Sequence, residues 1–175
     1  MAIFQMTGLS GAGKSTIASK VAEKLVQIGY KVEVLDGDET RKTICKGLGF
    51  SKEDRIENIS RLGFVANLLS RNGVVVIIAA INPYNEARTE LKEKYNAKLI
   101  YVSCQLEKLI ERDTKGLYKR ALLENNNPNK VYNLTGVSDS FDVPNSPDLA
   151  IETTKEHVEE SVDKFLEFIL TNTNQ

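Results

Sequence analysis

The stretch Gly8–Ser15 has the residue types and the spacing that bind the phosphates of a nucleotide. It reads GLSGAGKS and fits the P-loop pattern G-x-x-x-x-G-K-[ST]. Its glycines let the backbone turn around a phosphate and point N–H groups at it, and the start of the next helix adds a positive dipole end. We therefore expect ATP to bind here, with Lys14 at the β- and γ-phosphates and Ser15 on Mg²⁺. The residues expected to contact ATP are Gly8, Leu9, Ser10, Gly11, Ala12, Gly13, Lys14, Ser15 and Thr16.

Two carboxylates, Asp36 and Asp38, follow the strand-like run Lys31–Leu35 and are separated by one glycine. One can order Mg²⁺ or its waters, and the other can take a proton from an attacking hydroxyl group. The pattern does not say which aspartate has which task. The alternative is an ordinary Asp-Gly turn with solvated carboxylates. Next to a P-loop, the pair favours phosphoryl-transfer chemistry.

A group of hydrogen-bond donors comes next in the chain: Arg41, Arg55, Asn58 and Arg61. Arg55 and Asn58 are three residues apart on an expected helix, so they share a face. Since guanidinium groups bind anions in a planar fork, they would hold a second, anionic substrate. The alternative is surface arginines paired with Glu53, Asp54 and Glu57. Phe50, just before the helix, would stack on a base or form a hydrophobic staple.

Strand and helix patterns alternate along the chain, which predicts an α/β fold with a parallel β-sheet flanked by helices. In such sheets ligands bind at the carboxyl ends of the strands, so the P-loop and Asp36–Asp38 should face one crevice. We expect strands at Ala2–Met6, Lys31–Leu35, Val74–Ala80, Lys98–Val102 and Leu149–Ile151. We expect helices at Ile17–Ile28, Ser51–Arg71, Glu86–Tyr95, Leu106–Arg112 and around Val158–Ile169, with fraying at Thr171–Gln175.

The stretch 113–147 interrupts this alternation and is rich in glycine, proline and asparagine. A long irregular segment in a compact domain is usually a working loop, so we expect a lid here. It carries Lys115, Lys119, Arg120 and Lys130 near Arg112, a charge that suits a polyphosphate. The alternative is a solvated surface loop. The chain, residues 1–175, is expected to form one domain.

The net charge and the composition limit the classes of molecule that we expect the protein to bind. The 175 residues carry a net charge of −1, which predicts neither a nucleic-acid nor a membrane partner. The apolar run Val74–Ile81 is too short to span a bilayer, and no signal peptide is recognisable. The two cysteines, Cys45 and Cys104, lie far apart and are expected to be reduced thiols. We therefore expect a cytoplasmic protein acting on small molecules.

In order along the chain, these segments resemble the adenylylsulfate kinases, P-loop enzymes that phosphorylate the 3′-hydroxyl of adenosine 5′-phosphosulfate (APS). The matching pieces are GLSGAGKST at 8–16, LDGDETR at 35–41, GLGFSKEDRIENISRLG at 47–63, RDTKGLYKRA at 112–121 and LTGVSD at 134–139. The resemblance implies a kinase that uses ATP and Mg²⁺ in sulfate assimilation. Related enzymes are often homodimers.

The resemblance also implies residue roles. Asp38 would be the base for the 3′-hydroxyl, and Asp36 would join Ser15 at the metal. Lys14 and Lys115 would balance charge on the transferred group, with Lys115 in the lid. The acceptor nucleotide would contact Asp38, Arg41, Phe50, Arg55, Asn58, Ile81, Asn82, Lys115 and Leu134. Arg41, Arg55 and Asn58 would take its phosphosulfate end, Phe50 its base, and Arg112 would lie near the ATP adenine.

Three departures keep alternatives open. Leu134 stands where the family has a phenylalanine that stacks on the acceptor adenine, and stacking contributes about 1–3 kcal/mol per base. Asn82 replaces a serine sometimes proposed to be phosphorylated, and Asn85 replaces an arginine. The lid segment Asp139–Pro144 is less acidic. One alternative is a sister kinase acting on cytidine 5′-diphosphoramidate, whose smaller base Asn82 or Asn85 would read. A more remote one is a nucleotide-gated switch without transfer chemistry.

Overall fold

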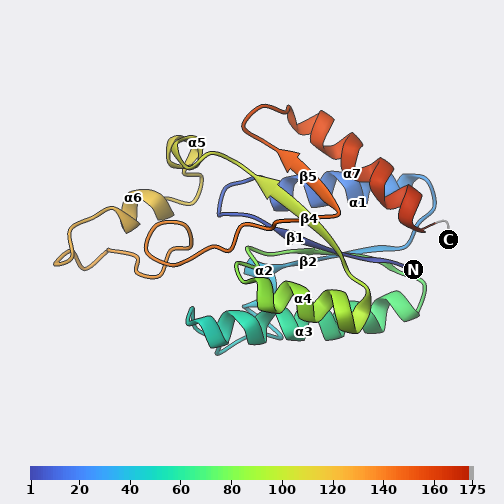
Figure 1. The fold of residues 1–175 in the computed structure, drawn as a ribbon, viewed down its shortest axis with the longest axis horizontal. Coiled ribbons are helices and arrows are strands. Elements are labelled where there is room, and N and C mark those ends of the chain that lie inside the picture. Colours follow the sequence, from blue (N-terminus) through green and yellow to red (C-terminus); the bar gives the residue numbers. More distant parts are fainter. Residues whose placement is uncertain (174–175) are drawn as a thin grey trace.

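The computed structural model describes residues 1–173, which form a five-stranded parallel sheet with helices on both faces (Figure 1). The strand order is β2-β3-β1-β4-β5. In register, Ile3 of β1 lies opposite Val76 of β3, and Phe4 lies opposite Lys98 of β4. The strands are β1 Ile3–Thr7, β2 Val32–Asp36, β3 Val75–Ala79, β4 Lys98–Ser103 and β5 Leu149–Glu152. The expected α/β class is therefore confirmed.

Strands β1 and β3 form the centre of the sheet, and every residue in both is buried. A central parallel strand is covered on both faces, which explains why β3 is apolar throughout. Besides Thr7 at its end, β1 has one other buried polar residue, Gln5 in its middle. Its Nε2 donates to the carbonyl oxygens of Arg88, at 2.9 Å, and Ala97, at 3.5 Å.

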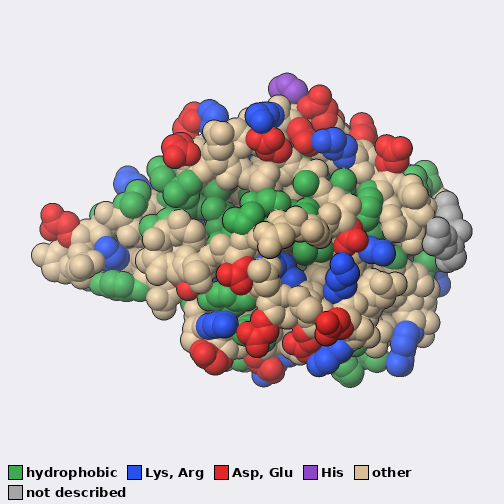
Figure 2. Space-filling model, in the orientation of Figure 1, with side chains coloured by type: hydrophobic (Ala, Val, Ile, Leu, Met, Phe, Trp, Pro, Cys, Tyr) green, Lys and Arg blue, Asp and Glu red, His purple; other side chains and the backbone are tan. Residues whose placement is uncertain are grey.

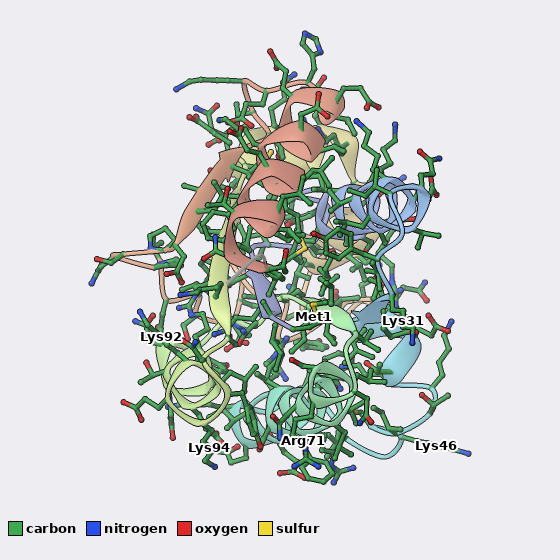
Figure 3. All side chains as sticks on the ribbon, turned by 90° about the vertical axis from the view of Figure 1, so that its right-hand side faces the viewer. Met1, Lys31, Lys46, Arg71, Lys92 and Lys94 are labelled. Atoms are coloured by element: carbon green, nitrogen blue, oxygen red, sulfur yellow. The ribbon has the colours of Figure 1, made fainter. Side chains whose placement is uncertain are left out.

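Two pairs of helices cover the sheet (Figures 1 and 3). Helices α1 (Lys14–Gln27) and α7 (Val158–Thr173) pack together on one face, over a core that contains Phe4, Val21 and Phe165. Helices α3 (Lys52–Arg71) and α4 (Asn85–Tyr95) cover the other face, over a second core. In Figure 3, Lys92 and Lys94 mark α4, and Arg71 marks the end of α3.

Most predicted element limits hold to within one or two residues. Ser51 caps α3 as expected, since its Oγ accepts the N–H of Asp54 at 3.1 Å. Strand β2 runs one residue further than predicted, to Asp36, and β5 runs to Glu152. The fraying expected from Thr171 is wrong for residues 171–173, which are helical; residues 174 and 175 lie outside the described part.

The segment 113–147, called the lid segment below, follows helix α5 (Leu106–Arg112). It contains one short helix, α6 (Leu117–Ala121), and is otherwise irregular. Its middle projects beyond the body at the left of Figures 1 and 2. Figure 2 shows charged side chains of both signs scattered over this face of the body, as the net charge of −1 suggests. A four-residue helix, α2 (Gly37–Thr40), directly follows β2.

Candidate active site

A cavity of about 570 Å³ opens at the carboxyl ends of β2 and β3, between the P-loop and the lid segment. Its wall is built from six stretches that are distant in the sequence: residues 10–16, 36–41, 50–59, 79–83, 114–117 and 131–135. Parallel strands bring these loops to one edge of the sheet, which is where ligands bind in such folds. The P-loop, both aspartates, the anion-binding candidates and the lid therefore meet at one place.

The P-loop is held in shape by close backbone packing. Gly8 has φ +151°, and a Cβ atom there would lie 2.2 Å from the carbonyl oxygen of Val102, so no side chain fits. Its N–H donates to the Ile81 carbonyl at 3.2 Å. Gly13, with φ +100°, turns the chain into α1. The loop is thereby fixed between β4 and the end of β3.

Lys14 is buried inside the loop. Its Nζ donates to the carbonyl oxygens of Gly8 and Leu9, each at 2.8 Å. The pKa of Lys14 is lowered to about 7, chiefly by burial and then by the nearby charge of Lys115, while Asp38 and Asp36 oppose the shift. The negative charge of a bound polyphosphate would favour the charged, ammonium form of Lys14.

Ser15 and Asp36 face each other across the cavity wall. The Ser15 hydroxyl donates to Asp36 Oδ2 at 2.6 Å, and Asp36 Oδ1 accepts the N–H of Asp38 at 2.9 Å, which caps α2. Two adjacent oxygen groups suit Mg²⁺, which takes few protein ligands beside phosphates and waters. Among residues 1–173 no group of three or more His, Cys, Asp or Glu side chains could hold a metal by itself.

Asp38 lies on α2 with its side chain 67% exposed, and it forms an ion pair with Lys115 of the lid segment. The lysine is itself half exposed. The structure thus joins two residues that are 77 positions apart, the candidate base and the candidate charge-balancing lysine.

The two arginines meet over Phe50. The guanidinium carbons of Arg41 and Arg55 lie 4.6 and 5.4 Å from the centre of its ring. Arg55 also donates to the Asn133 carbonyl at 2.7 Å and lies 3.3 Å from Asp139. The surface alternative is therefore wrong for Arg55, which is buried and whose carboxylate partner is Asp139 of the lid segment. Arg61, by contrast, does pair with Glu57 on α3. The Phe50 ring is too exposed, at 57%, for a staple.

Three buried polar side chains along the cavity wall have an oxygen without a hydrogen-bond partner in the described protein. They are Asn58 Oδ1, Asn82 Oδ1 and Thr135 Oγ1, and all three residues are at least 96% buried. Buried polar atoms are normally paired, so these three are exceptions, as is Arg88 Nε, whose residue does not line the cavity. Asn85, by contrast, does not line the cavity, and its Oδ1 is paired, since it accepts from Arg88 at 2.7 Å.

The lid segment is anchored to the P-loop. The Tyr118 hydroxyl donates to the Ser10 carbonyl at 2.8 Å, and Gly136 packs against Leu9. Leu134 lines the cavity and is 94% buried in the core around β1. Arg112 lies outside the cavity lining, where it donates to the Thr153 carbonyl at 2.8 Å; Thr153 in turn donates to Ala12.

Sequence reasoning missed three contributors: Tyr118, Tyr132 and Thr135. Tyr118 and Thr135 lie inside the quoted pieces RDTKGLYKRA and LTGVSD, so the resemblance carried a signal for them. Tyr132, 57% exposed at the cavity wall, stands alone in an irregular stretch, and no pattern singles it out.

Comparisons with known proteins agree with this geometry. The family model described as adenylylsulphate kinase matches residues 1–152. The chain belongs to the adenylylsulfate kinase family. It is 47% identical to the adenylyl-sulfate kinase of a Picosynechococcus species, over 91% of this chain and 88% of that protein. It is 49% identical to the enzyme of Microcystis aeruginosa, over 91% and 86%.

Solved structures of the family have the same fold. The APS kinase CysC of Mycobacterium tuberculosis, in complex with AMPPNP and APS, is 31% identical to this chain with a TM-score of 0.88. It covers 97% of this chain, which covers 98% of it. A hexameric APS kinase from Thiobacillus denitrificans has 28% identity and a TM-score of 0.68, and this chain covers 29% of it. No helix within residues 1–173 has the length and apolar character needed to cross a bilayer.

Proposed function

We propose that this protein transfers the γ-phosphoryl group of ATP to the 3′-hydroxyl of adenosine 5′-phosphosulfate. The observation that carries the proposal is a single cavity lined by a P-loop, by a carboxylate and by two arginines. The P-loop suits the donor, and Arg41, Arg55 and Asn58 suit the anionic end of an acceptor. The family supplies the identity of that acceptor, since relatives with about half of their residues identical are adenylyl-sulfate kinases.

In the proposed reaction the 3′-oxygen of the acceptor attacks the γ-phosphorus. The bond between that phosphorus and the bridging oxygen of ADP breaks, and Asp38 takes the hydroxyl proton. Lys14 and Lys115 balance the charge on the transferred group. For Lys115 to do so it exchanges its contact with Asp38 for one with phosphate, which frees the carboxylate to accept the proton. Closure of the lid segment would exclude water from the transfer.

Mg²⁺ would be held by Ser15 and Asp36, and it would supply positive charge that offsets the negative charge of the phosphates. Arg112, behind the P-loop, would lie near the ATP adenine, and Phe50 would stack on the acceptor base. The wider proposal is a cytoplasmic enzyme whose residues 1–175 form one kinase domain and which assembles as a homodimer. Light scattering of the purified protein would measure the assembly directly.

One observation favours a second candidate for the acceptor nucleotide. Leu134 is buried and presents no ring, so the base has less aromatic surface in the lid than the family pattern provides. A cytidine 5′-diphosphoramidate kinase needs less stacking surface.

An acceptor screen tests the proposal. Purified protein with ATP and Mg²⁺ is offered APS, cytidine 5′-diphosphoramidate or plain nucleoside monophosphates, and the phosphorylated product is identified by mass. We expect the highest kcat/KM with APS. A higher value with the cytidine compound would transfer the proposal to the sister kinase. ADP formation that does not depend on any acceptor would support the switch instead.

A further inference from the structure

Asp139 lies in the lid segment at the end of a tight turn formed by residues 134–139. The Gly136 N–H donates to the Asp139 carbonyl oxygen at 2.8 Å, and the Asp139 N–H donates to the Leu134 carbonyl oxygen at 3.2 Å. The Asp139 side chain is 21% exposed and does not line the cavity. It is therefore a fixed carboxylate beside the site, and neither the P-loop nor the proposed metal position uses it.

A tyrosine of the body holds this carboxylate in place. The Tyr84 hydroxyl donates to Asp139, with its oxygen 3.2 Å from Oδ1 and 3.1 Å from Oδ2. Tyr84 is buried directly before α4, and burial and the charge of Asp139 raise the pKa of its hydroxyl group, which therefore stays protonated and can donate. The carboxylate is thus fixed from the body as well as by its own turn.

Asp139 in turn contacts Arg55, one of the two arginines at the cavity. Its Oδ2 lies 3.3 Å from Arg55 Nε, which also donates to the Phe50 carbonyl oxygen at 3.1 Å. Arg55 Nη2 donates to the Asn133 carbonyl oxygen at 2.7 Å. Because a guanidinium group is planar, contacts at Nε and Nη2 fix the direction of Nη1. The lid segment therefore helps to set the orientation of an arginine that belongs to α3.

The remaining nitrogen of this arginine, Nη1, is available to a ligand. It has no hydrogen-bond partner within residues 1–173, yet it is not one of the fully enclosed unpaired atoms, so it keeps accessible surface. Arg55 lines the cavity. Two N–H groups of a cation that are accessible from a cavity suit an anion.

Asp139 also supplies the charge that balances Arg55. Arg55 is buried, and Arg41 lies over the same Phe50 ring, so two positive groups are close together. Within the described chain, Asp139 is the only carboxylate that forms an ion pair with Arg55. A buried cation without a partner is costly, so the carboxylate keeps the guanidinium group charged and in one orientation before any ligand binds.

We propose that Asp139, held by Tyr84, is a positioning residue for the acceptor: it orients Arg55 so that Nη1 binds the anionic end of that nucleotide. The identity of the nucleotide rests on the proposed function. Asp139 itself does not touch the substrate. Its removal should weaken binding of the acceptor and spare the donor, which lies on the P-loop. A residue that only fastened the lid would affect both ligands.

Isothermal titration calorimetry separates the two ligands. AMPPNP is titrated into the free protein and APS into the AMPPNP-loaded protein, so that each Kd refers to folded molecules alone. We expect Asp139→Ala to weaken APS binding about tenfold, the effect of one misplaced charge-assisted hydrogen bond, and to change the Kd of AMPPNP less than about twofold. Tyr84→Phe removes only the hydroxyl group and should weaken APS binding about threefold. Asp139→Asn keeps an oxygen for Nε and should stay within about threefold of the parent.

The matched control is Asp142→Ala. The Asp142 carboxylate lies in the same lid segment and accepts the Asn85 N–H at 2.9 Å, but it forms no ion pair with Arg55. We expect it to leave the ratio of the two Kd values within about twofold of the parent ratio. A second comparison uses Arg55→Met as the background. Because Asp139 acts through Arg55, Asp139→Ala should not weaken APS binding any further there.

Each outcome decides the proposal. Unchanged or tighter APS binding in Asp139→Ala, equal weakening of both ligands, or an Asp139→Asn variant as weak as Asp139→Ala overturns it. A further loss of APS affinity in the Arg55→Met background overturns it as well. Should Asp139→Ala not fold, Asp139→Ser, with a shorter side chain and no charge, replaces it.

The proposed function can fail separately. If the parent binds APS and does not phosphorylate it, the APS kinase proposal fails, and the calorimetric comparison still decides the role of Asp139. If the parent does not bind APS, the same variants are compared with cytidine 5′-diphosphoramidate, which also has an anionic end. A loss of affinity for that compound in Asp139→Ala would keep the assignment, and its absence would overturn it.

Discussion

At the scale of single residues, the cavity separates the charged groups by burial. Lys14 is enclosed by the P-loop and its pKa is near 7, while Asp38 and Lys115 are exposed and paired with each other. An exposed ion pair contributes little stability and exchanges partners easily. The geometry therefore suits a mechanism in which Lys115 pairs with Asp38 in the free protein and moves to the phosphates when a nucleotide binds.

Replacing Asp38 by asparagine removes the proton acceptor and keeps the shape of the side chain. We expect the rate of phosphoryl transfer to APS to fall by about 10² or more, because general-base catalysis contributes that much. ATP affinity, measured by calorimetry, should stay within about threefold, since the P-loop is unchanged. A transfer rate equal to that of the parent would remove Asp38 from the role of base.

The lowered pKa of Lys14 predicts proton uptake when a triphosphate binds. Above pH 7 the free protein holds Lys14 largely neutral, and the negative phosphates favour its charged form, so binding at pH 8 should take up a proton. At pH 6 Lys14 is already charged and the uptake should vanish. Calorimetry in buffers of different ionisation enthalpy measures this, with Lys14→Arg as the control that stays charged. Equal proton uptake at both pH values would contradict the assignment.

The residues of the P-loop and Asp36–Asp38 could be predicted because their spacing is local. The orientation of Arg55 could not be predicted, because Asn133 sets it from 78 residues further along the chain and Asp139 from beyond that.

At the scale of elements, the C-terminal half of the lid segment is joined to the body by several contacts. Gly136, with φ +86°, packs on Leu9 of the P-loop, and Arg55 of α3 contacts Asn133 and Asp139. Further along, the Asp142 N–H donates to the Pro83 carbonyl at 2.9 Å. Movement of the lid would therefore be transmitted to both the P-loop and the arginine site.

Gly136→Ala tests the lid contact. The new Cβ would lie 2.7 Å from a Leu9 methyl group, besides the strain of a positive φ. Gly73→Ala is the control, because its φ of +82° is nearly the same and no atom lies within 4 Å. Both variants should lose about 1–2 kcal/mol of stability from backbone strain. We expect KM for ATP to rise severalfold in Gly136→Ala alone. Equal KM values in the two variants would show that the lid contact does not shape the P-loop.

The helices and strands outside the lid follow from short-range patterns, such as the apolar run of β3 and the Ser51 cap of α3. The lid segment has no such pattern. Its conformation depends on partners that are distant in the sequence, such as Arg55 for Asp139 and Arg88 for the Asp142 carbonyl.

At the scale of the whole molecule, α7 completes the core although it lies beyond the residues that the family model matches. Phe165 of α7 meets Phe4 of β1 edge to face, with ring centres 5.8 Å apart. The site lies at the carboxyl ends of the strands, and Phe165 does not line the cavity. A substitution in the core-facing side of α7 should therefore lower the stability of the protein without changing its catalytic rate. The positions of the strands along the chain could be predicted, but their order within the sheet, β2-β3-β1-β4-β5, could not, because no local pattern encodes it.

Phe165→Ala should lower the free energy of unfolding by about 3–5 kcal/mol, since it leaves a cavity under α7. Urea unfolding measures the loss, and kcat/KM of the folded enzyme should stay close to that of the parent. The control is Phe64→Ala on α3, whose ring is 56% exposed and whose removal should cost less than about 0.5 kcal/mol. A similar loss in both variants would contradict the packing described for α7.

The most direct test of the account is the identity of the atom that receives phosphate. The enzyme is mixed with ATP, Mg²⁺ and either APS or 3′-deoxy-APS, and the products are identified by mass spectrometry. The account predicts a product one phosphoryl group heavier from APS, and none from the analogue that lacks the 3′-hydroxyl. Phosphorylation of the 3′-deoxy compound, or ADP released at the same rate with and without acceptor, would contradict it.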